Sequence, residues 1–190
     1  MWLTLLPGLA FGVMDVLAPL RLSQLGASAA MIGGTFRIAA AIESGIQPLM
    51  GRLSDRRGAL LPVRIALAAA VVVTLLTPVL PSEYLLVALL VVGLPSYGAL
   101  FAPATALLSA GADRMGLHQG LAFGLANLAW ASGQAIAASL SGALAQATSD
   151  FVPYALLAAI LLGTLAAAQA LDEPRQVQHD RVRRPAEHQG

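Results

Sequence analysis

The chain of 190 residues contains no cysteine and no lysine, and charged residues make up only 11% of it. Without cysteine it forms no disulfide bond and offers no thiolate to a metal. All basic residues are arginines, which we interpret, together with the abundant alanine, as a compositional bias of the source genome. The sequence also lacks a His-Glu-x-x-His pair, a phosphate-binding glycine loop and a metal-ligand cluster. We therefore expect no enzymatic activity, no cofactor, no metal and no nucleic-acid partner.

Hydrophobic residues, in contrast, make up 57% of the chain, and its mean hydropathy is +0.74. These values are typical of a multi-spanning membrane protein. Helices are the open-chain structure that satisfies every backbone polar group within lipid, so we predict an all-α fold. The six apolar runs that predict transmembrane helices lie at about 2–22, 29–50, 60–80, 84–110, 117–145 and 152–171.

Arginine placement predicts the orientation of these spans. Arginines lie in the second and fourth connectors and in the polar tail, whereas the first, third and fifth connectors hold none. We therefore place both chain ends in the cytoplasm. Segment 172–190 is polar and is expected to be a disordered cytoplasmic tail. Met1 leads directly into an apolar run, which is not typical of a signal peptide and indicates a chain that begins within something larger.

A faint repeat divides the six spans into two units of three. The first and fourth spans are both interrupted by glycine and proline, and an odd number of spans per unit requires successive units to be inverted in the membrane. Broken helices at corresponding positions of inverted repeats point to the central pathway of a transporter. The alternative is that glycine and proline are simply more common in membrane helices.

The charged segment 51–58 reads Gly-Arg-Leu-Ser-Asp-Arg-Arg-Gly and interrupts two long apolar runs. It is predicted to be a cytoplasmic loop between the second and third spans. The pattern resembles the signature loop of the major facilitator superfamily, which occurs between the same two helices. Its defining positions are Gly51, Leu53, Asp55, Arg56 and Gly58. The alternative is a plain turn rich in positive charge, which needs arginines but no such spacing of glycine, leucine and aspartate.

This resemblance covers about residues 1–171 and implies half of a major facilitator fold. Segment 116–133 is similar to the eleventh helix of bacterial drug-efflux-like members, so we favour the C-terminal half. The resemblance implies proton-coupled alternating-access transport of a small molecule in the bacterial inner membrane, with segment 51–58 latching a cytoplasmic gate. The partners would be the lipid bilayer and either a missing N-terminal six-helix half or a second copy. The alternative is a truncated membrane scaffold or regulatory subunit without transport of its own.

Charged side chains within the spans are candidates for the pathway, because burying a charge in lipid is costly. Asp15 and Arg37 lie at similar depths, so an ion pair between them is plausible as a substrate or proton site or as a static tie. Glu43 is either a protonation switch or a structural carboxylic acid, and Arg64 or a polar residue of the fifth span is expected to reach it.

The fifth span carries Phe123, Asn127, Trp130 and Gln134 on one stripe. This stripe either lines a cavity or bonds neighbouring helices. Tyr97 lines the pathway if the fourth span is a broken cavity helix, and faces lipid otherwise. An intramembrane Ser–His protease is not expected, because His118 and Ser141 lie at opposite ends of the same span.

Overall fold

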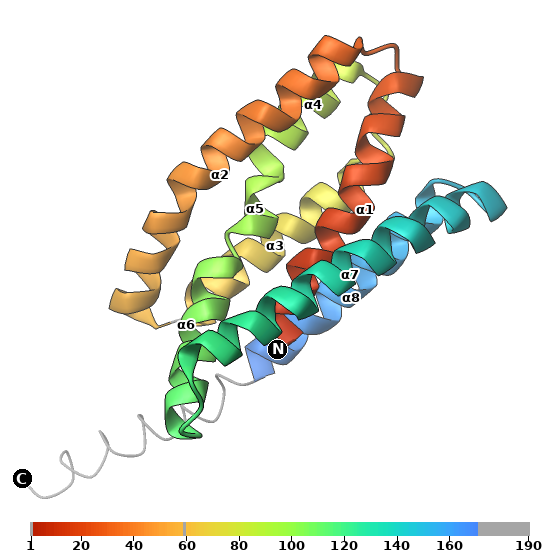
Figure 1. Ribbon diagram of the computed structural model, residues 1–190. Coiled ribbons are helices and arrows are strands. Elements are labelled where there is room, and N and C mark those ends of the chain that lie inside the picture. The colour runs from red at the N-terminus through yellow and green to blue at the C-terminus, as the bar shows by residue number, and fades with distance from the viewer. Residues whose placement is uncertain (1, 59, 171–190) are drawn as a thin grey trace, which may run out of the picture.

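The computed structural model describes residues 2–58 and 60–170, and every regular element in this part of the chain is an α-helix. The all-α fold expected from composition is therefore confirmed. The predicted tail at 172–190 lies outside the described residues. In chain order (Figure 1) the helices are α1 (Trp2–Gln24), α2 (Ala29–Arg57), α3 (Leu60–Leu76), α4 (Glu83–Gly93), α5 (Pro95–Gly98), α6 (Phe101–Arg114), α7 (Gln119–Ala147) and α8 (Phe151–Ala170).

These helices coincide with the six apolar runs once α4, α5 and α6 are taken together as the fourth. Within the described residues, four stretches are long and apolar enough to cross a membrane: Trp2–Gln24, Glu83–Arg114, Gln119–Ala147 and Phe151–Ala170. Helix α3 is apolar but has only 17 residues, and α2 carries charges along much of its length. That all six apolar runs cross the membrane therefore stays a prediction.

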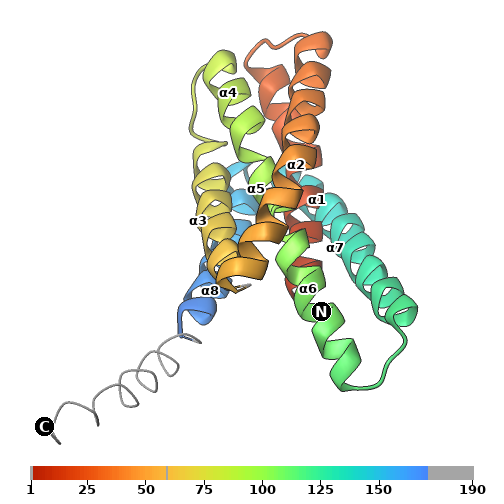
Figure 2. The ribbon, with the colours of Figure 1, turned by 90° about the vertical axis from the view of Figure 1, so that its left-hand side faces the viewer.

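The helices pack in pairs. α1 lies along α7, α2 lies along the broken α4–α6 span, and α3 lies along α8 (Figures 1 and 2). Numbered as six spans, these pairs are one with five, two with four, and three with six. Exchanging the first three spans with the last three leaves this pattern unchanged, as two related three-helix units would require.

The fourth span is broken, whereas the first is a continuous helix despite Pro7 and Pro19. Pro95, the first residue of α5, and Pro103, in the first turn of α6, each lack the N–H that would continue a backbone hydrogen-bond ladder from the preceding segment. The Ser96 hydroxyl donates to the Gly93 carbonyl at 2.6 Å and satisfies one acceptor at the break. The predicted interruption of both spans is thus found as a break in the fourth alone.

Segment 51–58 is not the loop that its composition predicts. Helix α2 continues through Arg57, and the chain turns at Gly58, whose φ of 80° is a backbone conformation that favours glycine. The charged residues therefore occupy the last two turns of a helix that extends beyond the apolar run. Charge marks where the helix leaves the apolar region, and the glycine marks where it ends.

Candidate functional site

Close packing of α1 on α7 places the first pair of candidate residues. Gly8 lies against the carbonyl oxygen of Trp130, and Gly12 lies against that of Gln134, so closely that a Cβ at either glycine would overlap the backbone of α7. Three residues after Gly12, the Asp15 carboxylate accepts a hydrogen bond of 3.0 Å from the Gln134 side chain. The glycine pair therefore sets the distance at which α1 presents its carboxylate to α7.

Arg37 does not pair with Asp15, contrary to the sequence-based expectation. Within the described residues, the side-chain partner of Asp15 is Gln134, and Arg37 lies exposed on α2. Similar depth in the membrane does not bring two side chains together unless their helices also turn them toward each other. The bond across α1 and α7 is the tie that the structure provides.

The second carboxylate, Glu43, lies at the break in the fourth span. Its carboxyl group occupies the space into which a Cβ at Gly98 would project. One turn further along α2, the Gln47 side chain donates to the Gly98 carbonyl at 3.3 Å. Two side chains of α2 thus hold the backbone of the broken span at one residue.

Arg64, which was one expected partner of Glu43, lies elsewhere. Its guanidinium donates to the Ala168 carbonyl, with the Nη2 atom 2.6 Å from the oxygen. A cation at the last turn of α8 also complements the helix dipole. Arg64 therefore ties α3 to the end of α8. The groups described around Glu43 are the Gln47 side chain and the Gly98 backbone.

The two carboxylates belong to one site. Asp15 lies one turn after Phe11 on α1, and the Phe11 ring meets that of Tyr97, the neighbour of Gly98 against which Glu43 packs. Asp15 is exposed and Glu43 is half-buried, so both reach an open face of the bundle. Two acidic groups, two amides and a helix break converge here on four helices, and this arrangement can bind or release protons or a cationic group.

The aromatic part of the site lies on α7. The Trp130 ring meets the Phe101 ring of α6 edge to face, with centroids 6.0 Å apart. The Trp130 indole nitrogen is buried and has no hydrogen-bond partner within the described residues. Asn127, one turn earlier on α7, is exposed. Of the predicted stripe, Asn127 is thus exposed, Gln134 binds Asp15 and Trp130 packs against α6.

Tyr97 has a structural position. Its side chain is fully buried, its hydroxyl lies 2.7 Å from that of Thr74 on α3, and its ring meets Phe11 of α1 edge to face at 6.1 Å. It therefore anchors the short helix α5 to two other helices and lies away from the open face. Its position next to Gly98 still lets it support the break that Glu43 contacts.

Replacing Tyr97 with phenylalanine is expected to lower the free energy of unfolding by about 1 kcal/mol, because the buried hydrogen bond between the Tyr97 and Thr74 hydroxyls would be lost and Thr74 would keep only its bond to the Ala70 carbonyl. Tyr154→Phe is the matched control. The Tyr154 hydroxyl is buried without a hydrogen-bond partner in the part of the chain described, so its removal should leave stability unchanged or raise it. Denaturant titration of both variants in detergent measures the difference. Equal losses would show that the hydroxyl bond contributes nothing.

The signature segment presents its charges outward. Asp55, Arg56 and Arg57 are exposed, and Asp55 makes no hydrogen bond or ion pair within the described residues. Nothing lies within 4 Å of a Cβ built at Gly51. The surface that this segment would close against is thus not supplied by the described helices.

Sequence reasoning overlooked the Gly8–Gly12 pair as a packing site, although its four-residue spacing was visible. Gly120 and Gly124 have the same spacing, but a Cβ at either would meet nothing within 4 Å. Within the described residues, no group of three His, Cys, Asp or Glu side chains could hold a metal ion. Ser141 bonds to the carbonyl of Ala138 in its own helix.

Comparison with known proteins adds the family. The model of the Major Facilitator Superfamily matches residues 1–119, which include α1 to α6 and the signature segment. Neither the curated proteins nor the solved structures yield a match. Members of this family are transporters rather than enzymes, and they move small molecules across a lipid bilayer. The chain therefore belongs to the major facilitator superfamily and is a multi-pass membrane transporter.

Proposed function

We propose that the described helices form one six-helix half of a secondary transporter, the C-terminal half of a bacterial drug-efflux-like member. It moves a small molecule by alternating access, with proton-coupled efflux as the mode. The observations that support this best are the packing of Glu43 against the break at Gly98 and the hydrogen bond that joins Asp15 of α1 to Gln134 of α7.

The coupling follows from charge and hydrogen bonding. Two carboxylates within reach of each other repel when both are ionised, so binding a proton or a cationic cargo relieves that repulsion. Gln134 binds Asp15 across α1 and α7, and Glu43 contacts the break in the fourth span. Neutralising either carboxylate therefore changes contacts between helices, and these are the contacts that must change when a pathway opens and closes.

The open face requires a second six-helix unit. Asp15 and Arg37 are exposed, and Asp55 projects from the end of α2. A further segment or a second copy would cover this face and would offer Asp55 a surface to latch against. We place the protein in the bacterial inner membrane with both ends in the cytoplasm, because most arginines then lie on the cytoplasmic side.

A scaffold or regulatory subunit is the second candidate. The bond between Asp15 and Gln134 favours it, because a carboxylate satisfied by a neighbouring helix can also be a static tie. In that case the hydrogen bond would hold α1 to α7 permanently, and the helices around it would not move.

Dye transport separates the two functions. The full-length protein, reconstituted in proteoliposomes with an imposed pH gradient, is expected to drive the cationic dye ethidium against its concentration gradient. Dissipating the gradient with a protonophore should stop this movement, and protein-free liposomes provide the baseline. Dye movement at the baseline, together with an intact fold, would favour the scaffold.

A further inference from the structure

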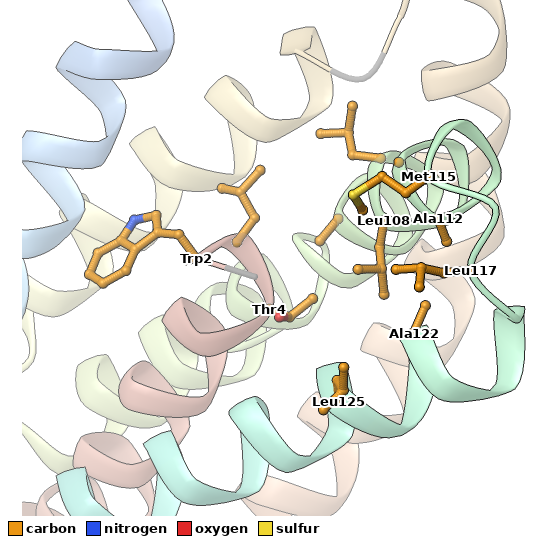
Figure 3. Close-up of a pocket in the computed structure, with 12 residues that line it drawn as sticks. Trp2, Thr4, Leu108, Ala112, Met115, Leu117, Ala122 and Leu125 are labelled. Carbon is orange, nitrogen blue, oxygen red and sulfur yellow. The ribbon is translucent and has the colours of Figure 1, made fainter.

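A large apolar cavity lies away from the two carboxylates. Its volume is about 510 Å³, it is partly open, and it is lined by the start of α1, by α6 and by the start of α7 (Figure 3). Among the lining residues, polar side-chain groups are confined to the Thr4 hydroxyl and the Trp2 indole, whose N–H donates to Thr164 on α8. Such a lining suits a hydrocarbon and disfavours a charged or strongly polar ligand.

The cavity exists because small residues face it where two helices diverge. α6 and α7 separate from the turn that joins them (Figure 2). Their facing positions include Ala104, Gly111, Ala112 and Ala122, which cannot fill the gap. The volume lies within the range of about 300–1,000 Å³ that is typical of ligand sites. The space is therefore built into the helix geometry.

The mouth of the cavity combines apolar residues with an arginine and a histidine. Met115 and Leu117 line it and are 69% and 41% exposed, respectively. Arg114 and His118 alternate with them along the turn between α6 and α7, and both are exposed. The nearby acidic residue, Asp113, already accepts a hydrogen bond from the Gln119 side chain.

This pattern matches one end of a lipid molecule better than it matches another protein helix. Apolar side chains that point into a cavity, with the Arg114 guanidinium at its mouth, complement a hydrocarbon chain attached to an anionic headgroup. We propose that the cavity binds an acyl chain of an anionic phospholipid and that Arg114 holds its phosphate. This site lies apart from the proposed transport pathway and does not require transport.

Trp2 reports on this site directly, because it lines the cavity and the chain contains just one other tryptophan, Trp130. The full chain carrying Trp130→Phe is placed in phosphatidylcholine vesicles. A small, fixed fraction of the lipid is either phosphatidylglycerol or phosphatidylcholine with brominated acyl chains, which quench tryptophan fluorescence. We expect quenching by the anionic lipid to be about fivefold stronger than by the zwitterionic lipid.

Two variants test the two parts of the site. Arg114→Gln should abolish the preference for the anionic lipid, and Gly111→Leu should remove the excess quenching by filling the cavity. A Cβ at Gly111 meets nothing within 4 Å, so the leucine can be accommodated without backbone overlap. Gly163→Leu on α8, which is equally open, is the control and should leave the preference intact.

Three results would overturn the proposal. Equal quenching by both lipids would show that the cavity does not select a headgroup. A preference that survives both Arg114→Gln and Gly111→Leu would place the lipid elsewhere. Absence of quenching by either lipid would show that another protein segment, such as a helix of the second unit, covers the mouth.

Discussion

A leucine in place of Gly12 is expected to prevent α1 from packing on α7. Its Cβ would overlap the Gln134 carbonyl oxygen and would lie 2.9 Å from both the Ala137 Cβ and the Ala138 backbone nitrogen. Because these are mainly backbone atoms of a helix, they cannot rotate away as a side-chain end would. We expect a loss of about 3 kcal/mol in the free energy of unfolding, measured by denaturant titration in detergent.

Gly124→Leu is the matched control for this variant. Gly124 lies on the same helix that receives Gly12, but a Cβ there meets nothing within 4 Å. The change in stability should stay within about 0.5 kcal/mol. If both leucines lower the free energy of unfolding equally, the loss comes from placing a large side chain at any helical glycine and not from the contact between α1 and α7.

Removing the two carboxylates is expected to have the largest effect on function. Asp15→Asn and Glu43→Gln keep the size of each side chain but prevent it from binding and releasing a proton. Each variant should reduce proton-driven ethidium transport to the level of protein-free liposomes. Exchange of dye across the membrane without a pH gradient should continue, because the size and packing of the pathway side chains are unchanged.

Glu83→Gln controls for the loss of a carboxylate as such. Glu83 lies in the first turn of α4, outside the proposed pathway. Its replacement should leave proton-driven transport unchanged. Normal coupling in both Asp15→Asn and Glu43→Gln would disprove the proposed roles, whatever the result at Glu83.

The sequence predicted much of the helical framework, because apolar runs of sufficient length have one structural solution in lipid. It did not predict how far α2 extends, since charge marks the edge of an apolar region and does not end a helix. Gly58 ends α2 by its backbone conformation, with φ at 80°. The glycine was recognised in the sequence, but the helical state of the residues before it was not.

Which side chains contact each other within the site was harder to predict than where each residue lies along its helix. Depth along a helix follows from counting residues, whereas the direction of a side chain depends on how two helices are turned. Asp15 and Arg37 matched in depth, yet Asp15 faces Gln134 on α7. A contact between neighbours in space can be predicted only once the helix pairs are known.

Glycine spacing shows the same limit. Gly8 and Gly12 have the same four-residue spacing as Gly120 and Gly124, but only the first pair contacts another helix in the described chain. This spacing indicates that another helix can approach the glycines closely. Which helix makes that approach depends on the packing of the whole bundle.

Alternating access of the face that carries Asp15 and Glu43 can be measured with single cysteines, because the natural chain contains none. Asn127→Cys lies on the exposed stripe of α7, and Leu162→Cys lies on an exposed part of α8. A membrane-impermeant maleimide is added from either side of the membrane to the full-length protein. We predict that Asn127→Cys reacts from both sides, with rates that change in opposite directions when the pH gradient is reversed, while Leu162→Cys stays unreactive. Equal protection of both cysteines would show that this face meets lipid and would contradict its role as a pathway.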